Sequence, residues 1–216
     1  MPHGSTEGSE IDPTGQDLDR AVDRTEGVQP GRRAFHATSG LLIAWLLASD
    51  PFGKSIVVPV LASALVLALG LDWWRLRSPT ANVRFFKSLR WLASPRERDR
   101  VASSTWYLIG VLGALLIAPT SYAVSAILVL ALADPAASVT GRLWGRRRVG
   151  TGTVLGTSVF FTVAFVIMAL RHPLPLSVTA AALVSAAEVL RVPIDDNVVV
   201  PLSAALALMG LAVWLG

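Results

Sequence analysis

Long apolar runs alternate with short polar segments along the chain, a pattern that predicts an all-α membrane protein. A membrane-spanning helix needs about 20 mostly apolar residues. Several of the runs are rich in alanine, glycine and serine, whose small side chains let neighbouring helices pack closely. We expect about seven transmembrane helices within one domain over residues 31–216, at residues 35–50, 55–71, 103–119, 121–139, 152–170, 174–190 and 197–215.

Residues 1–30 have a different composition. They are polar and hold seven of the fifteen acidic residues of the chain. Such a segment cannot bury enough apolar surface to fold alone, so we expect a disordered tail. It lacks the basic, apolar and small-residue regions of a signal peptide.

The basic residues predict how the helices are oriented. Cytoplasmic loops of membrane proteins are enriched in lysine and arginine. With a cytoplasmic N-terminus, 17 of the 19 basic residues fall on the cytoplasmic side, and only Lys54 and Arg171 fall on the other. We therefore expect a multi-pass protein of the cell (inner) membrane with its N-terminus in the cytoplasm.

Composition narrows the class of protein further. The chain is 53% hydrophobic and 16% charged, which excludes an ordinary soluble domain, and the absence of cysteine excludes disulfides and thiolate metal sites. Basic and aromatic residues alternate at 84–92, which predicts a helix on the membrane surface. Because juxtamembrane arginines account for the net charge of +4, we expect no nucleic-acid partner.

The uncommon polar residues gather on the predicted cytoplasmic side. Polar groups in membrane helices are costly, and a cluster of them indicates a functional site. The residues concerned are His36, Asp72, Asp134, Asp195, Asp196 and Asn197.

Asp134 is a lone carboxylate at the end of an apolar segment, where it costs several kcal/mol unless it is paired. One interpretation is a structural ion pair with Arg142 or a neighbour. The other is a ligand for Mg²⁺, which binds hard oxygens and shares them with phosphates. Pro135 disfavours a continuous helix, so we expect a break here, with Asp134 as the N-cap of a new helix that begins at Pro135.

Three other segments have two interpretations each. The glycines at 141, 145, 150 and 152 permit either backbone approach to a phosphate or close helix packing. The arginines at 146–148 fit either a triphosphate clamp or an anchor at the membrane surface. Arg32, Arg33 and His36 are spaced to share one helix face, as part of a site or as a snorkelling basic collar.

The segment at 194–197 also has two interpretations. Asp195 or Asp196 fits the N-cap of the last apolar helix, where it would accept hydrogen bonds from the first backbone amides. Alternatively, these acids and Asn197 belong to the predicted site.

Together these motifs resemble one family, the CTP-dependent polyprenol kinases. It includes phytol, farnesol and dolichol kinases and CTP-dependent diacylglycerol kinases, and is distantly related to phosphatidate cytidylyltransferases. The similarity runs from about residue 31 to 210. It consists of Arg32-Arg33-Ala-Phe-His36, Asp72-Trp-Trp-Arg75, Glu97 followed by Ser104-Thr-Trp-Tyr107, Asp134-Pro-Ala-Ala137 with Gly141 and Gly145, and Ile194-Asp-Asp-Asn197 with Pro201-Leu202.

The resemblance implies transfer of the γ-phosphate of CTP to a lipid alcohol at the cytoplasmic face. It implies Mg²⁺ on Asp134 and Asp196, and Asp196 or His36 as the group that orients or deprotonates the alcohol. The phosphate-binding residues it implies are Arg32, Arg33, Gly141, Arg142, Gly145, Arg146, Arg147, Arg148, Gly156, Thr157 and Asn197.

The chain departs from the family pattern after the glycines. The family continues with Lys-Ser/Thr-x-Glu-Gly-Ser/Thr, whereas this chain has Gly152-Thr-Val-Leu-Gly-Thr157, so Gly152 replaces the lysine and Leu155 the glutamate. The change removes a phosphate contact and a metal ligand or base. It favours one alternative, a non-catalytic membrane protein that binds lipid or nucleotide. Two others stay open: an enzyme that makes a CDP-lipid, and a transporter. The clustering of the polar residues at one face argues against the transporter, because transporter sites lie near the membrane midplane.

Overall fold

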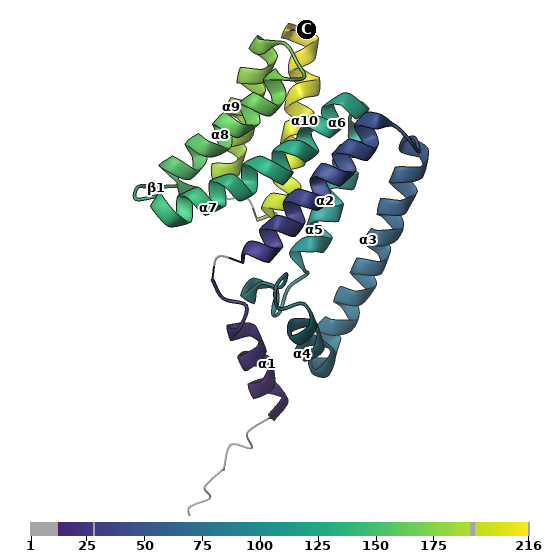
Figure 1. The fold of residues 1–216 in the computed structure, drawn as a ribbon, viewed down its shortest axis with the longest axis vertical. Coiled ribbons are helices and arrows are strands. Elements are labelled where there is room, and N and C mark those ends of the chain that lie inside the picture. Colours follow the sequence, from purple (N-terminus) through teal and green to yellow (C-terminus); the bar gives the residue numbers. More distant parts are fainter. Residues whose placement is uncertain (1–12, 28, 191–192, 216) are drawn as a thin grey trace, which may run out of the picture.

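The computed structural model describes residues 13–27, 29–190 and 193–215, which are almost entirely helical (Figure 1). One short antiparallel hairpin pairs Arg148 with Thr153 and Val149 with Gly152. The elements are α1 (Pro13–Asp23), α2 (Pro30–Ser49), α3 (Lys54–Arg77), α4 (Pro79–Ser88), the 3₁₀ turn η1 (Pro95–Glu97), α5 (Ser103–Ile117), α6 (Thr120–Leu128), the π-helical turn η2 (Val129–Ala133), α7 (Asp134–Trp144), β1 (Arg148–Val149), β2 (Gly152–Thr153), α8 (Val154–Ala169), α9 (Leu174–Val189) and α10 (Asp196–Leu215).

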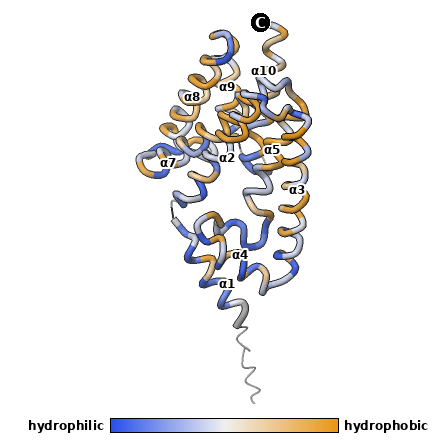
Figure 2. Tube along the Cα trace, turned by 45° about the vertical axis from the view of Figure 1, so that its right-hand side comes forward, coloured by the Kyte–Doolittle hydropathy of each residue, from blue (hydrophilic) through white to orange (hydrophobic). Residues whose placement is uncertain are grey.

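The main core lies where α5, α6, α8, α9 and α10 pack together. Side chains such as Ile127, Phe160 and Leu208 have no solvent exposure there. Helix α2 packs against α6, and α3 packs against α5 and α4. Figure 2 shows apolar sequence concentrated in these helices and polar sequence around α1 and α4 at the opposite end.

Each of the seven apolar segments predicted from the sequence forms a helix, so the all-α prediction is confirmed. Among the described residues, three helices are long and apolar enough to cross a membrane: α3, the continuous helix Thr120–Trp144, and α10. Helices α5, α8 and α9 are apolar but only 15 or 16 residues long. The chain is thus a membrane protein, while seven spans and a cytoplasmic N-terminus stay predictions.

The prediction of a disordered tail is wrong for residues 13–23, which form α1; residues 1–12 and 28 lie outside the described residues. Leu18, Ala21 and Val22 pack against Phe86 and other residues of a small second core. Their spacing places three apolar side chains on one helix face, which the polar average of the segment conceals. The helix also pairs Asp19 with Arg98 at 2.7 Å.

The predicted break at Asp134 does not occur. Ala133 and Asp134 have right-handed helical backbones, the helix runs on into α7, and Asp134 is not an N-cap. The chain accommodates Pro135 by widening the preceding turn into a π-helix, which relieves the clash between the proline ring and the turn before it.

A buried ion pair fixes the polar segment between α3 and α5. Arg75 donates to Asp72 at 2.7 Å, and both side chains are at most 5% exposed. Asp72 also accepts from Thr105 at 2.6 Å and from the Ala102 amide at 3.0 Å. Arg75 donates further to the Glu97 carbonyl at 2.8 Å. The motif Asp72-Trp-Trp-Arg75 therefore joins the end of α3 to the start of α5.

Gly110 is the point of closest approach between α5 and α10. A Cβ atom there would overlap the carbonyl oxygen of Asn197 and come within 2.9 Å of the Pro201 ring. We expect Gly110→Ala to destabilise the protein by about 1–3 kcal/mol through overpacking. Gly70→Ala is the matched control, since nothing lies within 4 Å of its Cβ position, and alanine there favours the helix by about 1 kcal/mol. Thermal unfolding of the two variants in the same detergent checks this, and equal midpoints would contradict the close packing.

Candidate active site

A large polar cavity of about 1270 Å³ lies at the end of the bundle where α2, α5, α7 and α10 meet the segment between α4 and α5. Its volume is ample for a nucleotide, since ligand pockets usually measure about 300–1,000 Å³. The charged residues that line it are Glu26, Arg32, Arg33, His36, Arg96, Glu97, Asp99, Arg100, Asp134, Arg142, Asp195 and Asp196.

Helix N-termini add partial positive charge to this cavity, whose lining has five arginines and six carboxylates. Residues in the first turns of α2, α5 and α10 line it: Arg33, Ser103 and Asn197. The N-terminal end of a helix carries a partial positive charge and free backbone N–H groups, which favour bound anions. With five lining arginines, the cavity is suited to a phosphate-bearing ligand.

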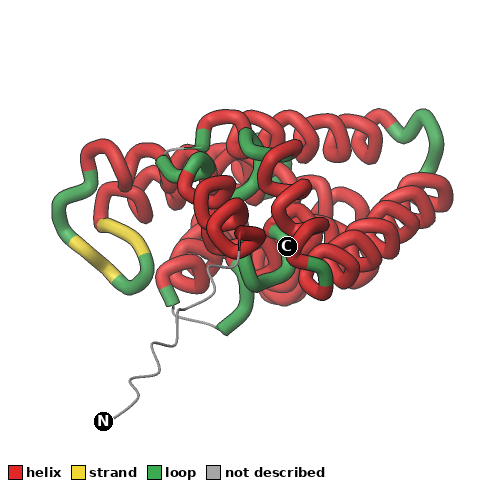
Figure 3. The backbone as a smooth tube through the Cα atoms, turned by 90° about the horizontal axis from the view of Figure 1, so that it is seen from below, coloured by secondary structure: helices red, strands yellow, loops and turns green. Residues whose placement is uncertain are grey.

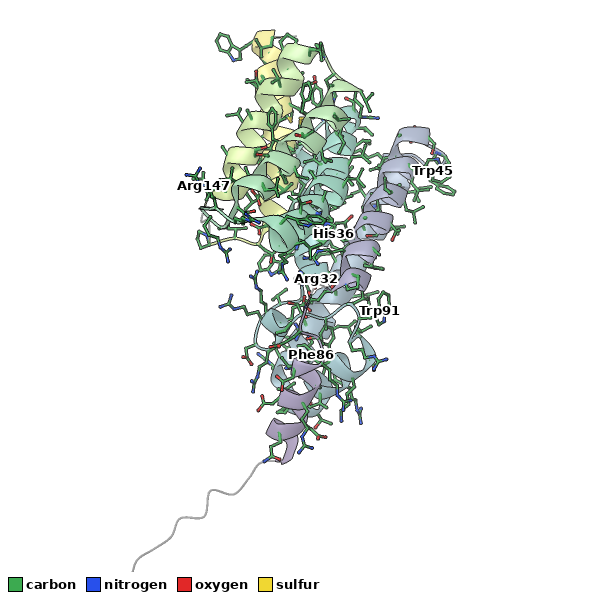
Figure 4. The ribbon with its side chains drawn as sticks, turned by 60° about the vertical axis from the view of Figure 1, so that its left-hand side comes forward. Arg32, His36, Trp45, Phe86, Trp91 and Arg147 are labelled. Carbon is green, nitrogen blue, oxygen red and sulfur yellow. The ribbon has the colours of Figure 1, made fainter. Side chains whose placement is uncertain are left out.

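Arg32, Arg33 and His36 line the cavity together, as their spacing predicts, and Figure 4 shows Arg32 and His36 close together along α2. Arg32 donates to the Ser103 hydroxyl at 2.6 Å, and its guanidinium lies 3.8 Å from Glu97. Arg33 donates through Nη2 to the Ser138 hydroxyl at 2.9 Å. Its Nη1 is buried without a hydrogen-bond partner among the described residues. A buried donor that lacks a partner is costly, and a bound anion would satisfy it.

The π-helical turn provides a hydrogen-bond partner for His36. Pro135 has no N–H to donate back to this turn. The Leu130 carbonyl, five residues earlier, lies 3.2 Å from His36 Nε2. Because a carbonyl only accepts, Nε2 is the nitrogen that carries hydrogen, and in the neutral ring Nδ1 is left as an acceptor.

Asp134 and Asp196 both line the cavity, Asp134 from the start of α7 and Asp196 from the start of α10. The charge of Asp196 acts on Asp134, and Arg32 and Arg33 act on Asp134 with the opposite sign. No ion pair of Asp134 with Arg142 is present; Arg142 instead donates to the Gly27 carbonyl at 3.4 Å. Among the described residues, Asp134 thus lacks the structural partner that the first interpretation required.

Asp195 and Asp196 have separate roles at the start of α10. Asp195 accepts from the Asn197 amide at 3.0 Å and from its side chain at 2.6 Å. Asp195 is therefore the cap, and the buried Asn197 is held by it. Asp196 does not cap the helix, and its side chain is exposed and lines the cavity.

The glycines pack helices together and do not line the large cavity. A Cβ at Gly141 would lie 2.8 Å from the Thr153 hydroxyl, and one at Gly156 would lie 3.0 Å from the Ala137 carbonyl; a Cβ at Gly145 would overlap Thr153. Thr153 itself accepts from the Gly156 amide at 3.1 Å and caps α8. The geometry matches the packing interpretation of these residues.

The three consecutive arginines lie outside the lining of this cavity. Arg146, Arg147 and Arg148 are exposed on the hairpin that joins α7 to α8. Figure 3 shows this hairpin at one side of the molecule, and Figure 4 shows Arg147 away from Arg32 and His36. The structure therefore does not bring them to Asp134, because β1 and β2 turn the chain outwards.

Glu188 near the end of α9 was not singled out from the sequence. Its charge acts on Asp134. Its carboxylate lies near Gly152, since a Cβ atom on Gly152 would be 3.8 Å from Glu188 Oε1 and 3.8 Å from Thr157 Oγ1. Glu188 Oε2 and Thr157 Oγ1 are both buried without a partner among the described residues. Glu188 thus supplies a carboxylate beside the segment in which Leu155 replaces the family's glutamate. The signal was present: like Asp134, it is a lone acid at the end of an apolar segment.

The carboxylates are compatible with Mg²⁺ that arrives with a nucleotide. Mg²⁺ in such sites takes one or two carboxylates, with substrate phosphates and water completing its shell. Asp134 and Asp196 supply two. Among the described residues no three histidine or acidic side chains are grouped closely enough to hold a metal alone, so the phosphates would have to complete the site.

Comparison with known proteins gives two similarities. The chain is 28% identical over 114 residues to CTP-dependent diacylglycerol kinase 1 of Eremothecium gossypii, and 28% identical over 115 residues to the protein of the same name from Schizosaccharomyces pombe. Each match covers 53% of this chain, and the matches span 36% and 52% of the two relatives. No protein-family model matches the chain, and no solved structure matches it.

These relatives agree with the motifs around the cavity. Both relatives are named as CTP-dependent kinases, and the cavity of this chain is lined by arginines and carboxylates. The similarities agree with the resemblance of the sequence motifs to CTP-dependent lipid kinases, and they do not distinguish one kind of such kinase from another.

Proposed function

We propose that this protein transfers the γ-phosphate of CTP to a lipid alcohol at the cytoplasmic face of the cell membrane. The observation that carries the proposal is the buried Arg33 Nη1, which has no partner among the described residues and belongs to a cavity shared with Asp134 and Asp196. An unsatisfied guanidinium donor beside two carboxylates suits a phosphate chain with its metal ion.

In the proposed reaction, the oxygen of the lipid alcohol forms a bond to the γ-phosphorus of CTP. The bond from that phosphorus to the β–γ bridging oxygen breaks, and CDP leaves. The alcohol proton passes to His36 Nδ1 or to the Asp196 carboxylate, both of which line the cavity. Arg32 and Arg33 neutralise charge on the transferred group.

Asp134 and Asp196 would hold Mg²⁺, which supplies positive charge to the phosphate oxygens when bound. Arg142 lines the same cavity and is suited to the nucleotide. Arg146–148, Gly141, Gly145 and Gly156 lie outside its lining, so we assign the phosphate contacts mainly to the first turn of α2.

The test uses purified protein in detergent with Mg²⁺ and either CTP or ATP radiolabelled at the γ-phosphate. Phytol, farnesol, dolichol and diacylglycerol are offered in turn as acceptors. Label in the lipid with CTP but not with ATP is the expected result, and it identifies the acceptor. Label released as pyrophosphate when phosphatidate is present would replace the proposal with a CDP-lipid synthase. No turnover, with CTP still raising the thermal midpoint, would mean a nucleotide-binding protein without kinase chemistry.

A further inference from the structure

A second, smaller cavity of about 210 Å³ lies between α2, α5 and the segment that follows α4. Its walls are largely apolar and include Phe35 and Ile43 of α2, Leu89 and Leu92 after α4, and Leu108 of α5. Phe35 and Leu89 are 46% and 37% exposed, so the cavity reaches the outer surface of the helices.

The two cavities share one wall. Arg32, His36, Glu97 and Ser103 line both of them. A molecule in the apolar cavity therefore has its inner end beside the same histidine and arginine that face the large polar cavity. An amphipathic molecule, with a hydrocarbon body and one polar end, fits this arrangement.

Tyr107 places an unsatisfied polar group at the shared wall. It lines the apolar cavity and is only 6% exposed, and its buried hydroxyl makes no hydrogen bond of good geometry among the described residues. The Ser39 hydroxyl is close enough to interact with it but donates to the His36 carbonyl at 3.1 Å. Its ring packs edge-on against His36, with 4.4 Å between the ring centroids. Buried hydroxyl groups almost always have a hydrogen-bond partner. A ligand hydroxyl beside His36 would provide one.

The outer rim has the composition of a membrane interface. Trp91 is 53% exposed and packs edge-on against Phe35 at 6.4 Å between ring centroids. Tryptophan is enriched where lipid headgroups meet the hydrocarbon. Figure 4 shows Trp91 beside the same stretch of α2 that carries Arg32. The apolar cavity thus opens at the depth where a lipid alcohol would present its hydroxyl.

We propose that the apolar cavity binds the first part of the hydrocarbon chain of the acceptor lipid, with the lipid hydroxyl within hydrogen-bonding reach of the Tyr107 hydroxyl and of His36 Nδ1. This inference rests on the proposed function, because it assigns the acceptor subsite of that reaction. The Tyr107 hydroxyl donates to the alcohol oxygen, and His36 Nδ1 accepts the alcohol hydrogen. The rest of the lipid hydrocarbon, one chain in a prenol or two in a diacylglycerol, lies in the bilayer outside the cavity.

The first test maps binding and does not depend on turnover. Full-length protein in detergent is irradiated with a C20 prenol, and separately with a diacylglycerol, that carries a diazirine within its first few carbons, and the labelled peptides are identified. Label within residues 35–43, 89–92 or 104–108 is expected for the true acceptor class. Label confined to other helices for both lipids would overturn the proposal, and because no phosphate is transferred, it does so whether or not the kinase assay succeeds.

Two variants on α5 test whether the hydrocarbon chain binds in the apolar cavity. Leu108→Trp should fill the cavity, lower photolabelling at least 5-fold and raise the KM for the acceptor at least 10-fold, with the KM for CTP within 2-fold of wild type. Leu116→Trp is the matched control, since Leu116 is 65% exposed on the same helix, and it should leave all three values unchanged. Equal photolabelling of the two folded variants would refute the cavity as the chain site.

Tyr107→Phe tests the hydroxyl contact and keeps the ring. Wild-type protein should bind the prenol about 10-fold more tightly than the hydrocarbon of the same skeleton that lacks the hydroxyl group, measured by competition for photolabelling. Tyr107→Phe should reduce this preference to 3-fold or less while binding the hydrocarbon as well as wild type does. An unchanged preference would show that the Tyr107 hydroxyl does not contact the alcohol.

Discussion

The substitution Asp134→Asn should lower kcat for phosphate transfer by a factor of about 10³ or more, while the protein stays folded. Removal of one group that stabilises transition-state charge typically costs about 10²–10³ in kcat, and Asp134 would in addition hold the metal ion. Asparagine keeps the size of the side chain, and the helix through η2 and α7 does not use Asp134 as a cap, so its backbone is retained. Steady-state kinetics with CTP and the acceptor, with thermal unfolding in parallel, measure both effects.

The matched control is Asp50→Asn. Asp50 is exposed just after α2, outside the lining of both cavities, and it has a left-handed backbone that asparagine also tolerates. Its kcat should stay within 2-fold of wild type. Turnover by Asp134→Asn at the level of this control would show that Asp134 takes no part in the reaction.

Replacement of Arg75 by methionine should destabilise the protein by about 3–5 kcal/mol, the largest stability effect we expect. Breaking a buried ion pair leaves the remaining charge buried without compensation. Here Asp72 would lose its 2.7 Å partner, and the Glu97 and Arg100 carbonyls would lose a donor each. Arg75→Lys should recover little of the loss, because an ammonium on a flexible stem cannot reproduce the planar fork of the guanidinium.

Arg77→Met is the control for this effect. Arg77 lies two residues away on the same helix, exposed, with its guanidinium 4.4 Å from the centre of the Trp73 ring. Such an exposed contact is worth about 0.5–1 kcal/mol. Thermal midpoints and protease resistance of the segment 78–102 separate the two variants. A midpoint for Arg75→Met as high as that for Arg77→Met would mean that the buried network does not hold this segment in place.

Periodicity and composition predicted the helices well, because a run of apolar residues longer than about 15 leaves few alternatives to a helix in a membrane. The same reasoning placed Asp134 and Asp196 at the same end of the helix bundle, because each of these acids lies at a boundary of an apolar segment. Residues 13–23 were misjudged because an amphipathic helix with three apolar residues has the average composition of a polar tail. Its stability depends on the partner surface around Phe86, which the local sequence does not contain.

The connection from α7 to α8 was the hardest to predict. Three consecutive arginines near a carboxylate look like a phosphate clamp in one dimension. The hairpin at Arg148–Thr153 instead turns these arginines outwards. The position of the hairpin depends on the close packing of Gly141 and Gly145 against Thr153, which the local sequence does not reveal. The π-helical turn could not be predicted from the local sequence either. A proline indicates that the helix is irregular, but it does not tell whether the helix breaks or widens by one residue. Glu188 was missed although the argument applied to Asp134 applies to it equally.

The unequal lengths of the helices bear on the bilayer around the protein. Helices α8 and α9, with 16 residues each, rise about 24 Å, whereas the 24 residues of α3 rise about 36 Å. A hydrocarbon core is about 30 Å thick, so α8 and α9 are shorter than this core, whereas α3 is longer and ends in the polar turns that carry Asp72, Arg75 and Arg77. If α8 and α9 cross the bilayer as the sequence predicts, the lipids beside them would thin to match the short helices. We therefore expect lipids with shorter acyl chains to be preferred on the side of the molecule formed by α8 and α9.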